Sequence, residues 1–210
     1  PCASCYSRLK FAQEKAKDEA FRKDVEEVAG VKFASDVAVL PLLDVVTEKI
    51  GLDAVQARIT KPLAGFNAAC YYGCLLTRPP KVTGSEKYEN PVQMESVLEA
   101  LGAAPVDWNM KTYCCGAAFA LTRTEVVLEL TKRILQDALD AGAGCVAVAC
   151  PLCHSNLDTR QEQINAKYGT KFQIPVFYFT ELMGLAFGMK PVDLGINRHR
   201  AMHRDKKEDC

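Results

Sequence analysis

The 210-residue sequence lacks two features that would place the chain in a membrane or on a nucleic acid. It has no apolar run long enough to cross a bilayer, because proline, glycine or charged residues interrupt the longest ones. It also lacks an excess of charge of either sign, since 26 basic residues balance 26 acidic residues. A nucleic-acid-binding protein needs a basic surface that displaces counterions. We therefore expect neither membrane insertion nor nucleic-acid binding.

The sequence also has no initiator methionine and no signal peptide, and it begins with Pro1 and Cys2. Natural chains rarely begin in this way, so we expect a part of a longer protein. Cysteine, in contrast, is abundant, with ten residues. Several stand in CxxC and CC groups, which in a chain without a secretion signal favour metal or redox chemistry over disulfides. This usage predicts a reducing, cytoplasmic compartment.

The hydrophobic pattern divides the chain into a helical part and an alternating part. Residues 1–60 are predicted to be helical, with helices over 9–29, 41–50 and 54–59 that end at glycines or begin at capping residues. From residue 61, buried strands alternate with helices, which is typical of a parallel sheet. The expected strands are 66–72, 106–109, 145–149 and 174–179, and the expected helices include 91–101, one opened by a Thr122–Glu125 capping box, 150–167 and 181–187.

The predicted fold class is therefore α/β. A small, Rossmann-like parallel sheet flanked by helices follows a helical N-terminal segment. The expected organisation is a helical segment over 1–60, a cysteine-rich domain over 61–190 and a polar tail over 191–210.

Five cysteines are predicted to meet at one edge of this sheet. Cys74 and Cys150 each follow a predicted strand, and the carboxyl ends of parallel strands share an edge where α/β folds bind ligands. Cys114 and Cys115 lie in a connecting loop. Cys150 and Cys153 open a helix, whose free N–H groups favour thiolates.

Two kinds of metal centre are compatible with these thiols. Zinc prefers four tetrahedral ligands, usually from two CxxC-like pairs. The sequence instead offers one CxxC, one CC and one single cysteine, and adjacent side chains do not easily reach one small ion. A cluster with several irons offers separate points to neighbouring thiolates, so we favour iron–sulfur and keep zinc as the alternative.

These cysteines stand in motifs that resemble the cysteine-rich CCG domain, and in particular the B subunit of the heterodisulfide reductase family. The resemblance covers residues 65–187 and rests on Tyr71-Tyr72-Gly73-Cys74, Cys114-Cys115-Gly116 and Cys150-Pro151-Leu152-Cys153-His154. Family members carry two such domains. Cys2 and Cys5 resemble the closing CxxC of the first one.

The resemblance implies a specific function. Cys74, Cys114, Cys115, Cys150 and Cys153 would bind a 4Fe–4S cluster of non-cubane type, which is lost in air. The full-length protein would reduce a thiol-coenzyme disulfide with electrons from two partners, the flavin-containing A subunit and the cubane iron–sulfur C subunit. We expect this chain, an oxidoreductase subunit fragment, to be inactive alone. The alternatives are a zinc-bound structural or assembly module and an electron-transfer subunit with an acceptor other than a disulfide.

The remaining cysteines and histidines have plainer interpretations. Cys70 and Cys145 lie in predicted strands and are expected to be core thiols, and Cys210 is expected to be exposed. His154 either assists catalysis, by hydrogen-bonding a cluster sulfur or moving a proton to a thiolate, or is a helix-surface residue. His199 and His203 are expected to be solvated.

Overall fold

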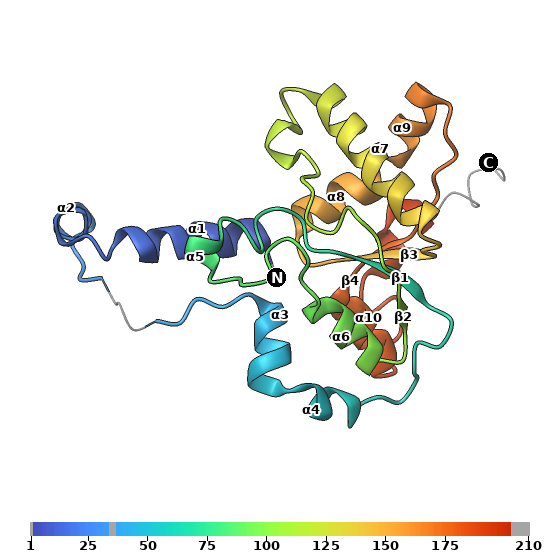
Figure 1. The fold of residues 1–210 in the computed structure, drawn as a ribbon, viewed down its shortest axis with the longest axis horizontal. Coiled ribbons are helices and arrows are strands. Elements are labelled where there is room, and N and C mark those ends of the chain that lie inside the picture. Colours follow the sequence, from blue (N-terminus) through green and yellow to red (C-terminus); the bar gives the residue numbers. More distant parts are fainter. Residues whose placement is uncertain (1, 34–36, 203–210) are drawn as a thin grey trace.

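A four-stranded parallel sheet forms the centre of the computed structural model, which describes residues 2–33 and 37–202 (Figure 1). The strand order is β2-β1-β3-β4. The strands are β1 (Asn67–Tyr71), β2 (Ala104–Pro105), β3 (Cys145–Val148) and β4 (Val176–Tyr178). Every residue of β3 is buried, as its unbroken apolar sequence predicts for a strand covered on both faces.

Helices cover both faces of the sheet (Figure 1). On one side lie α6 (Gln93–Ala100) and α10 (Phe179–Ala186). On the other lie α7 (Thr124–Asp140), α8 (Pro151–Thr159) and α9 (Gln161–Tyr168). The alternation of strands and helices along the chain therefore gives the predicted α/β fold with a parallel sheet.

Some element boundaries differ from the predicted ones. β2 ends at Pro105, not within 106–109, because Trp108 leaves the sheet and donates its indole N–H to the Cys70 carbonyl at 3.1 Å. α7 begins at Thr124 without a side-chain cap, so the predicted capping box at Thr122 is wrong. The predicted helix 150–167 is divided at Arg160 into α8 and α9.

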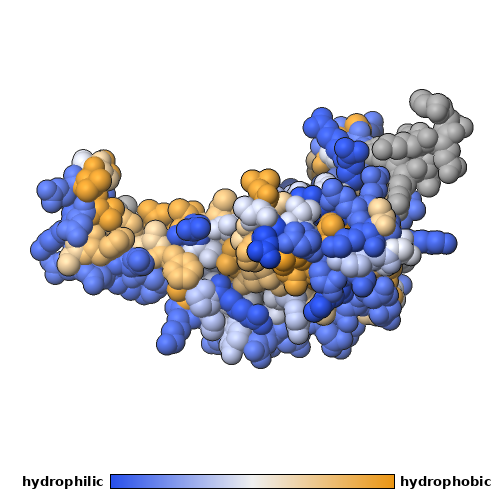
Figure 2. Space-filling view, turned by 90° about the horizontal axis from the view of Figure 1, so that it is seen from above, coloured by the Kyte–Doolittle hydropathy of each residue, from blue (hydrophilic) through white to orange (hydrophobic). Residues whose placement is uncertain are grey.

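The N-terminal segment extends away from the sheet (Figure 1). The predicted helix 9–29 is instead α1 (Ala3–Lys15) and α2 (Glu19–Ala29), because the Asp18 side chain caps a new helix by accepting from the Phe21 amide at 3.0 Å. No residue of α2 is buried, and its Phe21, Val25 and Val28 side chains are exposed. Figure 2 shows hydrophobic and hydrophilic residues mixed at the left end of the molecule.

Short helical elements complete the described chain. They are α3 (Leu42–Asp44), a π-helical turn η1 (Val45–Ile50), α4 (Leu52–Gln56), α5 (Pro80–Thr83) and the 3-10 turns η2 (Ala117–Phe119), η3 (Ile196–Arg198) and η4 (Arg200–Met202). None of the helices within the described ranges is long and apolar enough to span a membrane.

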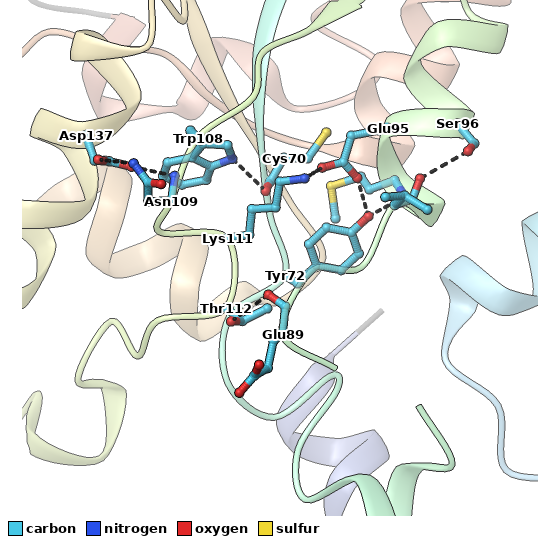
Figure 3. A network of polar contacts seen from close by, with 12 residues as sticks. Cys70, Tyr72, Glu89, Glu95, Ser96, Trp108, Asn109, Lys111, Thr112 and Asp137 are labelled. Atoms are coloured by element: carbon cyan, nitrogen blue, oxygen red, sulfur yellow. Dashed lines mark hydrogen bonds and ion pairs between the residues drawn. The ribbon is translucent and has the colours of Figure 1, made fainter. Parts of the chain in front are cut away.

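A buried ion pair ties the segment before Cys114 to the end of β1 (Figure 3). Lys111 Nζ lies 2.7 Å from Glu95 Oε1, and the Tyr72 hydroxyl donates to the other oxygen of the same carboxylate. The backbone adds to this attachment, because the amides of Tyr72 and Gly73 donate to the Lys111 carbonyl at 2.9 and 3.1 Å. Glu95 in α6 therefore connects the end of β1 to the loop that precedes Cys114.

This network predicts a large stability loss when one charge is removed. Lys111→Met should lower the free energy of unfolding by about 3–5 kcal/mol, because it leaves the Glu95 carboxylate buried without its cation. Urea titration followed by circular dichroism measures the change. The double variant Lys111→Met/Glu95→Gln, which keeps an acceptor for Tyr72, should recover part of the loss. A Lys111→Met variant as stable as the parent chain would show that the pair does not hold this loop.

Candidate metal centre

Five thiols from three segments lie together at the carboxyl edge of the sheet. Cys74 follows β1, Cys150 follows β3, and the Cys114–Cys115 pair precedes η2. Cys115 Sγ lies 3.6 Å from Cys153 Sγ. The Cys74 thiol donates to Cys114, and Cys153 also contacts Cys150. The structure therefore brings together all five cysteines that the sequence singled out.

The two adjacent cysteines face different partners. Cys114 pairs with Cys74 and accepts the Gly116 amide at 3.3 Å, whereas Cys115 pairs with Cys153. Gly116 adopts a φ of +79°, and a Cβ there would lie 3.1 Å from a Leu130 methyl group. This turn lets neighbouring side chains point to separate sulfurs, which matches a centre with several metal atoms better than a single ion.

Neighbouring thiols and amide groups lower the pKa of three of these cysteines, Cys114, Cys115 and Cys150, and so favour their thiolate form. The pKa of Cys150 is lowered to about 5 by donation from the Cys153 thiol and by N–H groups of Cys153, Leu152 and, in α1, Ser4. The pKa of Cys114 is lowered to about 6 by the Cys74 thiol and then by the Gly116 and Ala117 amides. Cys74 holds the shared proton, so its pKa is raised.

Three further residues shape the centre. Asn156, one turn after Cys153, donates to the Cys115 carbonyl at 3.2 Å and to its sulfur at 3.5 Å. Sequence reasoning missed it, although its spacing on the helix was visible. Tyr71 donates to the Tyr113 carbonyl at 2.7 Å, and burial raises its pKa, so it remains a donor. Gly73 has a φ of +68°, and a Cβ there would lie 3.1 Å from Cys153 Sγ.

A cleft of 700 Å³ lies between α1 and residues that neighbour the cysteine motifs in sequence. One wall is α1, with Arg8, Phe11 and Lys15. The other wall takes residues next to each cysteine motif: Leu75, Ala117, Ala118 and Leu152. Cys2 caps α1, accepts the Cys5 amide at 3.4 Å and lies near enough to Cys150 for the two charges to interact. The two CxxC helix starts therefore face one another.

Histidine placement differs from the sequence interpretation. His154 is buried, 9% exposed, so the helix-surface interpretation is wrong. Its Nε2 bonds the Val176 carbonyl at 3.1 Å, and among the described residues no hydrogen bond joins it to a cysteine. His199 is also buried, beside Glu181, and its predicted solvation is wrong. Cys70 and Cys145 are core thiols, as predicted. His203 and Cys210 lie outside the described residues.

Comparison with known proteins relates this group of thiols to one family. The CCG cysteine-rich domain matches residues 68–158, which include all five cysteines. The B subunit of the ferredoxin/F(420)H(2)-dependent CoB-CoM heterodisulfide reductase from Methanosarcina acetivorans is 32% identical over 205 residues, which are 94% of this chain and 68% of that protein. The chain belongs to the B-subunit family of heterodisulfide reductases. A second family member, from Methanosarcina mazei, is similar to the same extent.

The chain is also similar to one further protein in sequence and to one solved structure in fold. The 8-methylmenaquinol:fumarate reductase membrane anchor subunit of Wolinella succinogenes is 29% identical over 94% of this chain and 70% of its own length. A crystal structure of a hypothetical protein from Helicobacter pylori superimposes with a TM-score of 0.69, covering 91% of this chain and 35% of that one at 12% identity. At this identity the second likeness concerns the fold alone.

The pKa values and the exposure of the side chains together predict that Cys114 is the most reactive of the five thiols in the reduced, cluster-free chain, because Cys150, whose pKa is also lowered, is buried. Because its pKa is about 6, most of Cys114 should be thiolate at neutral pH and react with iodoacetamide, with a rate midpoint near pH 6. Cys74, whose pKa is raised, should stay unlabelled in the same sample. Peptide mass spectrometry over a pH series measures both. A Cys114 midpoint near the ordinary value of about 8.5 would contradict donation to Cys114 by the Cys74 thiol and by the amides of Gly116 and Ala117.

Proposed function

We propose that the five-cysteine group binds a 4Fe–4S cluster of non-cubane type and that the chain is the disulfide-reducing part of a heterodisulfide reductase-like subunit. The single observation that carries this proposal is the convergence of sulfurs from three segments, with Cys115 and Cys153 at 3.6 Å. When bound, the cluster would supply one-electron transfer.

The residues present fit such a cluster in three ways. Cys114 and Cys115 diverge toward different sulfurs, so each can take a separate iron. Besides the neighbouring thiols, the groups that donate hydrogen bonds to these sulfurs are amides, which stabilise negative charge without competing for the metal. Gly73 leaves the space beside Cys153 free of a side chain.

The cleft along α1 supports a small disulfide as the substrate. All three cysteine motifs contribute a neighbouring residue to its wall, so a bound disulfide would lie beside the thiols. Phe11 and Leu75 would contact an apolar chain, and Arg8 and Lys15 would attract anionic groups at its ends. The names of the Methanosarcina relatives specify a CoB-CoM heterodisulfide. For this chain we propose a thiol-coenzyme disulfide with at least one anionic group.

The electrons would come from partner proteins of the same complex. Two relatives are named as ferredoxin-dependent enzymes, and all three named relatives are single subunits of larger reductases. From this relationship we propose that the donor is the cubane iron–sulfur C subunit, which receives its electrons from the flavin-containing A subunit. The role of this chain's residues is to hold the cluster and to orient the disulfide.

Metal analysis tests the cluster directly. Anaerobic reconstitution should give about four irons and four acid-labile sulfides per chain, and Cys115→Ser should lose most of both, because it removes the central thiol of the group. Cys70→Ser is the matched control, since Cys70 is a buried strand thiol outside the group. Zinc without iron or sulfide in the parent chain, or a Cys115→Ser variant with full iron, would sink the proposal.

The space beside Cys153 gives a second test. Gly73→Ala should abolish most iron incorporation, because the new Cβ meets Cys153 Sγ at 3.1 Å. Gly142→Ala is the control: its φ of +80° imposes the same strain, about 1–2 kcal/mol, but nothing lies within 4 Å of its Cβ. Iron content per folded chain is compared after reconstitution. Equal losses in both variants would attribute the effect to backbone strain and not to the centre.

A further inference from the structure

A second group of metal-ligating side chains contains no cysteine. It consists of His154 in α8, Glu181 in α10 and His199 between η3 and η4. All three residues are buried, and one ligand atom of each lies within 4.8 Å of the others. The chain thus brings two imidazoles and a carboxylate together from three segments, a donor set that proteins use for divalent transition metals.

The hydrogen bonds of His154 leave one nitrogen ready to bind a cation. Val176 O can only accept, so its 3.1 Å contact requires a proton on His154 Nε2. Nδ1 then carries a free lone pair. The ring is also stacked on Tyr178, with centroids 4.5 Å apart, which fixes its orientation. A backbone carbonyl that holds the distal N–H is the usual support of a metal-binding histidine.

Glu181 and His199 form the other half of the site. His199 Nε2 lies 3.1 Å from Glu181 Oε1, close to the separation of about 3.3 Å between two ligands of tetrahedral zinc. The second carboxylate oxygen, Oε2, accepts the Tyr178 amide at 2.9 Å, so the carboxylate is oriented as metal-binding carboxylates are.

His199 Nδ1 has no hydrogen-bond partner within the described part of the chain, although it is buried. If Nε2 carries the proton and donates to Glu181, Nδ1 is left as a bare, desolvated acceptor, which is costly. A metal on Nε2 would take the place of the proton that Nε2 now shares with Glu181 and would leave the proton of the neutral ring on Nδ1. The described residues therefore do not satisfy both nitrogens of this buried ring.

We propose that His154, Glu181 and His199 bind a divalent transition-metal ion such as Zn²⁺, at a site separate from the cysteine centre. Binding requires His154 Nδ1 to approach Glu181 Oε1 and His199 Nε2, which already lie 3.1 Å apart. Asp158 in α8, which accepts the amides of Arg200 and Ala201 at 2.8 and 3.0 Å, already attaches η4 to the domain. The bound ion would connect the same segment to α8, whose N-cap residue is Cys150.

X-ray absorption spectroscopy of zinc bound to the full chain tests the site. After iron–sulfur reconstitution, one equivalent of Zn²⁺ should bind with nitrogen and oxygen ligands at about 2.0–2.1 Å and without sulfur at about 2.3 Å. Glu181→Gln keeps an acceptor for the Tyr178 amide and should weaken zinc binding at least about tenfold, since even outer-shell changes have effects of this size. Glu162→Gln, an exposed glutamate in α9, is the matched control and should bind zinc as the parent does.

The outcomes separate this site from the cysteine centre. A sulfur shell around zinc, absence of zinc binding, or equal affinity in Glu181→Gln and the parent would overturn the site. The parent spectrum needs no variant, so a folding defect in Glu181→Gln cannot decide the result. Iron measured on the same samples reports independently on the cluster. Zinc on nitrogen and oxygen in a chain that holds no iron would support this site while refuting the cluster.

Discussion

The attachment of one loop to the end of β1 makes the thiol group possible. Cys74 and Cys150 follow neighbouring parallel strands, so the sheet alone brings them to one edge. The Cys114–Cys115 pair has no such guide, because β2 contains only two residues. Two contacts of Lys111 position this pair instead. The Lys111 carbonyl accepts the amides of residues 72 and 73, and the Lys111 side chain forms the buried ion pair with Glu95. The positions of the Cys114 and Cys115 sulfurs therefore depend on the buried Lys111–Glu95 ion pair.

The sequence predicts the features that are local or periodic. Strands β1, β3 and β4 were found from apolar runs, and the five cysteines from their spacing and their places at strand and helix ends. The details that it missed depend on distant partners. β2 is two residues long and is fixed by pairing with β1, and Asn156 gains its role only when Cys115 arrives from another segment. His199 lies in a polar stretch, and its burial follows from contacts with Glu181 and with the rings of His154 and Phe177, which come from distant segments.

Charge around the thiols is balanced mainly by amides. Among residues 2–33 and 37–202, the hydrogen bonds to these sulfurs come from backbone or asparagine N–H groups or from another thiol, and none comes from lysine or arginine. Amides carry partial charges only, so several thiolates together would repel one another strongly in the absence of a cation. This arrangement suits a site that becomes fully deprotonated only when metal is present.

The two CxxC helix starts have a mechanical consequence. The N-terminus of α8 and the N-terminus of α1 both direct amides at Cys150. Each helix end carries about half a positive charge, so the two ends repel each other unless an anion lies between them. The sulfur of Cys150 is that anion. The charge at Cys150 therefore contributes to holding the start of α1 against the sheet edge, together with the buried Tyr6 side chain, whose hydroxyl donates to the Thr83 carbonyl at 3.2 Å.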